Sequence, residues 1–199
     1  MIRFDLTRRR YGRLAVAGLF SATCSRGLGR EPETLPQGGG PTERPFKRDY
    51  PAPEFRPSWK SAQINRTMVS DFVIYAHSDL QMTQRLLNQE PKLINASMDW
   101  GAGDFETALG GASHMGRTDI VKYLLSHGAR PNLHCAAMLG QLDVVKSLLE
   151  FEPKLIDAKG PHGFSLHFHA QVGGRESKPV LEYLQGVKQV ELRPIPFLK

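Results

Sequence analysis

The chain is poor in cysteine and has no long apolar segment. Only two cysteines, Cys24 and Cys135, occur among its 199 residues. A disulfide framework of the kind that supports small secreted domains is therefore not expected, and we predict that Cys135 is a small buried apolar residue. No stretch reaches the roughly 18 apolar residues of a membrane-spanning helix, so the sequence predicts no transmembrane segment.

Beyond its first thirty residues, the chain also lacks a net charge. The formal net charge is +6, and residues 1–30 account for all of it, with seven arginines against the single acid Asp5. Residues 31–199 hold 19 basic and 19 acidic side chains. Phosphate binding requires a cluster of basic side chains on the folded part of a protein. We therefore expect no nucleic-acid partner.

Residues 1–30 are predicted to be an export signal rather than part of a folded domain. A basic segment precedes a short, mildly apolar one at 14–22, and small residues follow, as in signal peptides. The segment Thr7–Tyr11 reads Thr-Arg-Arg-Arg-Tyr and resembles the bacterial twin-arginine export signal, although Gly12 stands where an apolar residue is usual. The resemblance implies export to the periplasm or cell envelope. The alternative is a disordered basic tail.

Cys24 lies at the end of this leader, after small residues. Lipidation there would anchor the protein to a membrane, although Ser21 stands where the bacterial lipobox has leucine. Without lipidation, we expect cleavage near residues 23–27. Residues 31–57 then contain seven of the fourteen prolines and three consecutive glycines, a composition typical of a disordered linker. The folded domain is expected at 58–199.

An apolar pair recurs four times in this domain, each time at the end of a segment with helical apolar spacing. The four pairs are Leu86-Leu87, Leu124-Leu125, Leu148-Leu149 and Tyr183-Leu184. The second unit, residues 106–129, is the clearest, with Thr-Ala-Leu, a glycine turn, Ile-Val-x-x-Leu-Leu and a closing Gly-Ala.

This pattern resembles the ankyrin repeat over about residues 68–187. The resemblance implies an all-α fold, a short solenoid of about four helix-turn-helix units. Ile120, Val121, Leu124 and Leu125 are expected to form a buried stripe, and Gly128 is expected to end its helix with a positive φ.

The spacing of the pairs is uneven. The third pair follows the second by 24 residues, whereas an ankyrin repeat is about 33 residues long. The missing residues fall between Ala129 and Leu133, where the projecting β-turn finger is expected. We predict that the third unit lacks its finger and that the binding surface is interrupted between the second and third units. The first unit is degenerate, with helices expected at 70–76 and 80–87.

Seven histidines raise the question of a metal or catalytic site. His134, His162, His167 and His169 are the candidate cluster, and zinc requires three or four such ligands in fixed geometry. The ankyrin resemblance instead places His134 and His167 where the ring bonds to backbone between neighbouring turns. No Ser, Cys or Thr has the sequence context of a nucleophile. We therefore predict no metal, no cofactor and no enzymatic activity.

A binding surface can be predicted from the concave side of such a stack. Aromatic residues and methionine are typical anchors for a protein partner, although Trp100 and Phe164 could simply cover helix ends. The candidate partner-binding residues are Trp100, Asp104, Phe105, His114, Met115, Met138, His162, Phe164 and Phe168.

The sequence thus predicts a monomeric, non-enzymatic scaffold in the periplasm or cell envelope that binds an unidentified protein. Contact with a membrane is expected only through a lipid anchor at Cys24. One alternative is a small periplasmic metal-handling or hydrolytic protein that uses the His134, His162, His167 and His169 cluster. The other is a structural envelope lipoprotein without a specific partner.

Overall fold

The computed structural model describes residues 43–55, 58, 60–195 and 197. Residues 43–55 are exposed and contain no helix or strand. The twin-arginine-like segment and Cys24 lie outside the described residues, so the export signal and the lipidation stay predictions. Within the part that the structure describes, no helix is both long and apolar enough to cross a membrane.

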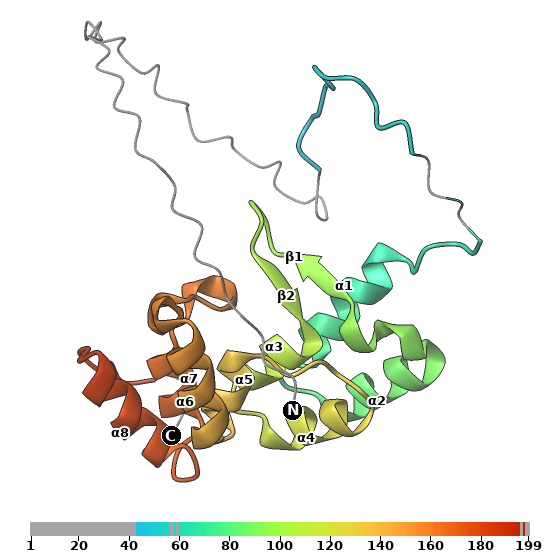
Figure 1. Cartoon of the computed structure of the whole chain (residues 1–199). Helices are drawn as coiled ribbons and strands as arrows, with labels where there is room; N and C mark the ends of the chain where they lie inside the picture. Colours follow the sequence, from blue (N-terminus) through green and yellow to red (C-terminus); the bar gives the residue numbers. More distant parts are fainter. Residues whose placement is uncertain (1–42, 56–57, 59, 196, 198–199) are drawn as a thin grey trace, which may run out of the picture. The chain divides into compact units, whose positions relative to one another are not determined.

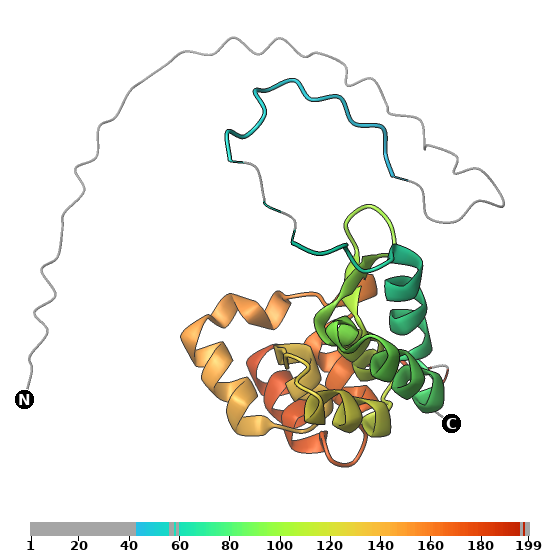
Figure 2. The same cartoon turned by 90° about the vertical axis from the view of Figure 1, so that its right-hand side faces the viewer.

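The described residues form eight α-helices in four consecutive pairs, which confirms the four predicted helix-turn-helix units (Figures 1 and 2). The pairs are α1 (Arg66–Tyr75) with α2 (Leu80–Gln89), α3 (Ala108–His114) with α4 (Thr118–Ser126), α5 (Leu133–Met138) with α6 (Leu142–Phe151), and α7 (Leu166–Val172) with α8 (Lys178–Val187). The first helices of the units pack in the order α1, α3, α5, α7. In the second layer, α2 packs on α4 and α6 packs on α8.

The first helices of the last three units begin in the same way. The side chains of Thr107, Asn132 and Ser165 each accept a hydrogen bond from the backbone N–H three residues later, at 3.2, 2.8 and 3.2 Å. Such N-caps satisfy amide groups that have no partner within the helix. Helix α1 is capped by Asn65 instead, so it begins four residues before the predicted start at Ser70.

The connections between units are unequal. Between the first and second units, the 3-10 helix η1 (Pro91–Asn95) leads into the antiparallel strands β1 (Ser97–Asp99) and β2 (Phe105–Thr107). We call residues 97–107 the finger. Residues 127–132, between α4 and α5, contain no strand, which confirms the predicted loss of the third finger. The last connection contains η2 (Pro153–Asp157) and η3 (Pro161–Gly163).

Among the residues that the structure describes, the apolar core consists of two clusters. The first contains Phe72, Leu109, Ile120 and Leu124, and the second, in the third and fourth units, contains Leu149, Leu166 and Leu184. Ile120, Val121, Leu124 and Cys135 are fully buried, as predicted, whereas Leu125 is half-buried. Gly128 has a φ of +88°, as predicted.

Met138 and the segment after α8 also contribute to the first cluster. Met138 was expected on the binding surface, but it is only 1% exposed. That expectation is wrong, because the inner side of α5 packs Met138 into the first cluster. Residues 188–195 contain no helix, and they return along α7. There Arg193 accepts a hydrogen bond from the Gln171 side chain at 2.8 Å, and Ile195 is buried in the first cluster.

The close approach of α7 to α5 predicts opposite effects for two glycine substitutions. A Cβ on Gly173 would lie 2.0 Å from the Met138 carbonyl oxygen, so Gly173→Ala should destabilise the protein by roughly 1–3 kcal/mol. A Cβ on Gly186 in α8 would meet no atom within 4 Å, so Gly186→Ala should stabilise by about 0.5–1 kcal/mol. Urea unfolding of both variants measures the difference, and equal effects would contradict the packing of α7 on α5.

Candidate functional site

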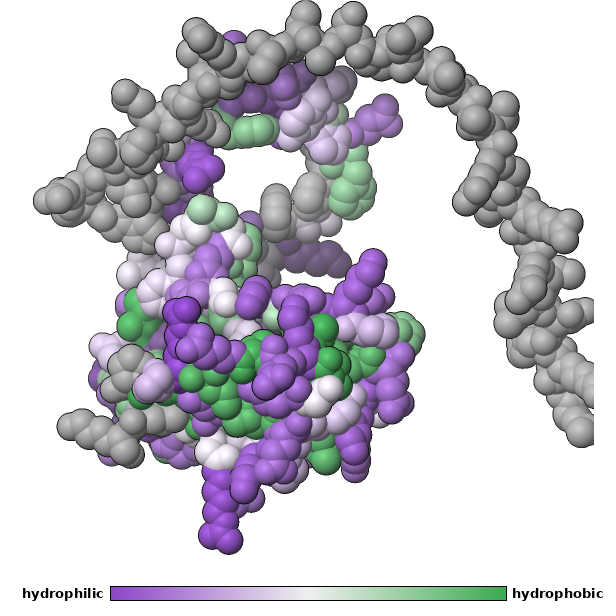
Figure 3. Space-filling model, turned by 90° about the vertical axis from the view of Figure 1, so that its left-hand side faces the viewer, coloured by the Kyte–Doolittle hydropathy of each residue, from purple (hydrophilic) through white to green (hydrophobic). Residues whose placement is uncertain are grey.

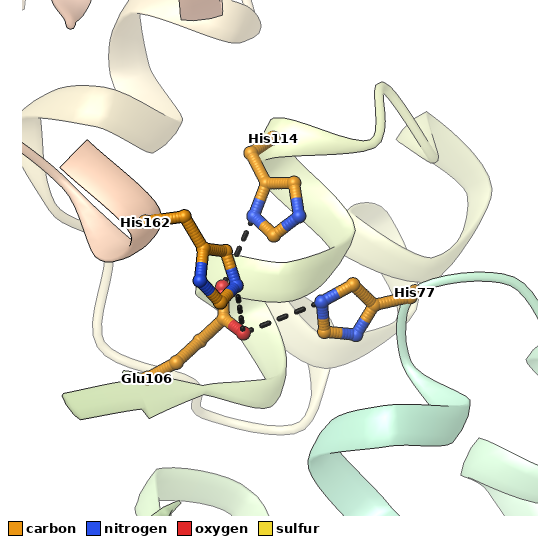
Figure 4. A group of neighbouring side chains, drawn as sticks. All are labelled: His77, Glu106, His114 and His162. Atoms are coloured by element: carbon orange, nitrogen blue, oxygen red, sulfur yellow. Dashed lines mark ion pairs between the residues drawn. The ribbon is translucent and has the colours of Figure 1, made fainter. Parts of the chain in front are cut away.

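A buried carboxylate at the base of the finger organises the candidate site. Side chains alternate between the two faces of β2, so that Phe105 is exposed and Glu106 is 1% exposed. Three imidazoles surround this carboxylate (Figure 4). They belong to His77, which follows α1, to His114 at the end of α3, and to His162 in η3. We call these four residues the Glu106 cluster.

The ring nitrogens lie within ion-pairing distance of the carboxylate oxygens. His114 Nδ1 is 3.0 Å from Glu106 Oε1, and His77 Nε2 is 3.3 Å from Oε2. His162 Nε2 lies 3.5 Å from Oε2, which also accepts a hydrogen bond of 2.7 Å from the Trp100 indole N–H. Four side chains from three units thus converge on one carboxylate.

The opposite edges of two of these rings are held by other groups. His77 Nδ1 lies 2.9 Å from the Val73 carbonyl oxygen, and His162 Nδ1 lies 2.9 Å from Asp104 Oδ2. These oxygens only accept hydrogen bonds, so each Nδ1 carries the proton and donates it. In both rings, Nε2 is the nitrogen that faces the carboxylate of Glu106. A Cβ on Gly111 would lie 2.5 Å from the His77 ring. The absence of a side chain at Gly111 therefore leaves room for the His77 ring against α3.

The electrostatics of the cluster favour a negative carboxylate with a positive charge beside it. Burial would raise the pKa of Glu106, but the neighbouring imidazoles of His114 and His77 lower it to about 2. Burial would likewise lower the pKa of His77, but the adjacent Glu106 carboxylate raises it. Glu106 is therefore ionised at neutral pH, and its surroundings favour a proton or another cation.

The cluster joins the first, second and fourth units and bypasses the third. Because the third unit has no finger, the turn before α7 reaches the finger of the second unit. There the His162 backbone N–H donates to Asp104 Oδ1 at 3.0 Å, and a Cβ on Gly110 would lie 3.6 Å from the Pro161 ring. The expected interruption is therefore bridged by the fourth unit. A pocket of about 350 Å³ remains between the two, lined in part by Asn132 and Lys159.

The predicted histidine cluster does not assemble as proposed. The rings of His134 and His169 are neighbours, with centroids 4.8 Å apart, but His162 faces Glu106 instead. His167 donates to the Lys188 carbonyl oxygen at 2.9 Å. His134 contacts the Ala158 carbonyl oxygen at 3.4 Å, so both predicted backbone bonds are confirmed. The metal-handling alternative based on His134, His162, His167 and His169 is therefore wrong in its ligand set.

The predicted partner-binding residues separate into exposed and buried ones. Trp100 and Phe105 are exposed, by 41% and 64%. His114 is 3% exposed, and its expected place on the surface is wrong because its ring faces Glu106. Of the other predicted members, His162 is exposed, whereas Asp104, Met115, Phe164 and Phe168 are half-buried.

Most of these other members serve the interior of the site. Asp104 is half-buried and pairs with His162. Phe164 is half-buried between His114 and Phe168, at centroid distances of 5.2 and 4.1 Å. Met115 is also half-buried. Two members of the Glu106 cluster, His77 and Glu106 itself, were missed from the sequence. The one signal in the sequence was the charge of Glu106, which directly precedes the Thr-Ala-Leu motif.

The buried histidine His169 predicts a loss of stability in acid. It is 1% exposed, and burial lowers its pKa to about 4 from the ordinary 6.5. Its contribution is complete above pH 6.5 and is lost as the pH falls, because the unfolded chain then binds the proton more tightly. The loss should reach roughly 3 kcal/mol near pH 4. Urea unfolding between pH 7 and pH 4 should show a smaller pH dependence for His169→Gln, and equal dependences would contradict the prediction.

Comparison with known proteins agrees with the stacked helix pairs. Residues 72–159 match the family model described as Ankyrin repeats (3 copies), a span that includes α2 to α6 and the finger. No curated protein matches the sequence. The fourth helix pair continues the same stacking beyond the matched residues. Residues 72–159 therefore contain three ankyrin repeats, and the folded part of the chain is a short ankyrin-repeat solenoid.

Proposed function

We propose that this protein is a non-enzymatic scaffold, exported to the bacterial cell envelope, that binds a protein partner through its finger. Ankyrin repeats are in general protein-interaction modules without catalytic activity, and the three repeats at 72–159 support that class. Fold alone does not identify a partner. The finger carries the proposal because it combines a fixed backbone with exposed aromatic side chains.

The tip of the finger is held in one conformation by Asp99. Its carboxylate accepts hydrogen bonds from the backbone N–H groups of Gly101 and Gly103, at 2.8 and 3.0 Å. Across the turn, the backbone N–H of Trp100 donates to the Asp104 carbonyl oxygen at 2.9 Å. All three tip residues, 101–103, have positive φ. A finger already ordered before binding loses little conformational entropy when a partner docks.

Two large aromatic side chains are exposed on this finger. Phe105 is 64% exposed and Trp100 is 41% exposed, and the pocket lined by Phe105, Asn132 and Lys159 lies beside Phe105. Aromatic side chains next to a recess are typical of interface hot spots. Figure 3 shows another face of the molecule, on which apolar side chains are interrupted by polar ones.

The finger proposal predicts that one substitution removes most of the binding. Phe105→Ala should weaken capture of the partner from envelope extracts at least tenfold, because hot-spot truncations cost about 2 kcal/mol or more. Phe151→Ala is the matched control, since Phe151 is 85% exposed at the end of α6, outside the finger. Capture that is reduced equally by both variants, or by neither, would contradict a finger-based interface. A failure to capture any protein would favour the structural lipoprotein.

The export part of the proposal is supported by residues 1–30 of the sequence. The double substitution Arg8→Lys and Arg9→Lys should keep the protein in the cytoplasm, because a paired arginine is the hallmark of the twin-arginine signal that this segment resembles. Arg10→Lys is the control, since the twin-arginine pattern, Ser/Thr-Arg-Arg-x-Phe, leaves the position after the arginine pair free. Cell fractionation followed by immunoblotting measures the distribution. Unchanged export of the double variant would contradict this route.

A further inference from the structure

The Glu106 cluster offers one potential metal-ligand atom from each of four residues. The ligand atoms of His77, Glu106, His114 and His162 all lie within 4.8 Å of one another. They come from the turn after α1, from β2, from the end of α3 and from η3. This cluster differs from a group of exposed acids, since Glu106 and His114 are only 1% and 3% exposed.

Three atoms in the centre of the cluster lack an ordinary hydrogen bond. Among the described residues, His77 Nε2, Glu106 Oε1 and His114 Nδ1 are buried and have no partner of acceptable hydrogen-bond geometry. His114 Nδ1 and Glu106 Oε1 are nevertheless only 3.0 Å apart. Buried polar atoms are almost always paired. Atoms that lie close but do not point hydrogens at one another are the arrangement of ligands around a common centre.

The outer edges of the rings support the same conclusion. A metal-bound histidine usually donates its second ring N–H to a carbonyl or carboxylate, which fixes the ring and directs the other nitrogen to the ion. His77 does so through Val73, and His162 does so through Asp104, each at 2.9 Å. The Trp100 indole N–H donates a hydrogen bond of 2.7 Å to Glu106 Oε2, which provides a similar outer contact for the carboxylate.

We propose that these four residues bind one Zn²⁺ ion, which connects the first, second and fourth units at the base of the finger. Imidazole nitrogen with a single carboxylate suits zinc, whereas Ca²⁺ and Mg²⁺ prefer oxygen ligands alone. Neighbouring ligands in a tetrahedral zinc site are about 3.3 Å apart. The distances from Glu106 Oε2 to His77 and His162 are 3.3 and 3.5 Å. Four protein ligands define a structural site.

Such an ion would also stabilise the negative charge of the buried Glu106 carboxylate. It supplies a positive charge beside the buried Glu106 carboxylate, and it does so from the centre of the donor set. His162 retains 30% side-chain exposure, so the ion has a route of entry from solvent. The proposal concerns the interior of the site and does not depend on which partner, if any, binds to the finger.

The test measures zinc in the purified full-length protein. We expect one Zn²⁺ per chain by elemental analysis and, after chelator treatment, one site with sub-micromolar affinity in competition with a chromophoric chelator. Zn²⁺ should raise the melting temperature of the metal-free protein, and EDTA should reverse the increase. In a Trp59→Phe background, Trp100 is the single tryptophan, so Co²⁺ or Cu²⁺ should quench its fluorescence at the same stoichiometry.

Matched variants identify the ligands. His162→Gln, on the partly exposed turn, should fold and bind Zn²⁺ at least tenfold more weakly. His127→Gln is its control, since His127 is exposed at the end of α4 and contacts Tyr123, and it should bind as the original protein does. Glu106→Gln should fold, as circular dichroism will show, and should lose the zinc-dependent rise in melting temperature.

Two outcomes would overturn the proposal. One is an original protein that binds no zinc at low-micromolar concentration. The other is a protein whose zinc affinity is the same in His162→Gln, His77→Gln and His127→Gln. Either result would make the cluster an ion-pair network held by protons alone.

Discussion

The burial of the Glu106 carboxylate is the constraint on which the arrangement of the finger depends. An ionised carboxylate loses its hydration when it is buried, at an effective cost of several kcal/mol unless other groups compensate. The compensation comes from His77, His114, His162 and Trp100, all within 3.5 Å of its oxygens. Helix α1, helix α3 and the turn before α7 must each be placed correctly, so one charge specifies the relative position of three units.

The short third unit makes this convergence geometrically accessible. A full finger between α4 and α5 would lie between the second and fourth units, where Asn132 and Lys159 now line a pocket. With only residues 127–132 in that connection, Asn95 bonds directly to the backbone of Gly128 and Arg130, at 3.3 and 2.9 Å. The fourth unit then meets Asp104 through His162. The deletion thus changes which units are neighbours on the finger side of the stack.

The alternation of side chains along β2 connects the outer surface to this interior. Phe105 is exposed, whereas Glu106, the next residue, is surrounded by imidazoles. Trp100 belongs to both environments, since its ring is 41% exposed and its N–H bonds to Glu106. The exposed Phe105 ring and the buried Glu106 carboxylate are therefore separated by a single peptide unit.

The sequence by itself determined the repeating helix pairs, because each unit encodes its own apolar period and cap, and each of the last three encodes its turn glycine, within about 25 residues. Ile120 and Leu124 are buried, Gly128 has a positive φ and the third finger is absent, as local spacing predicted. The tertiary structure decided the site. His77, Glu106 and His162 belong to different units, and nothing local to any of them indicates that they meet. Their convergence follows from how the units stack and from the residues that the third unit lacks, and both are properties of the packed chain.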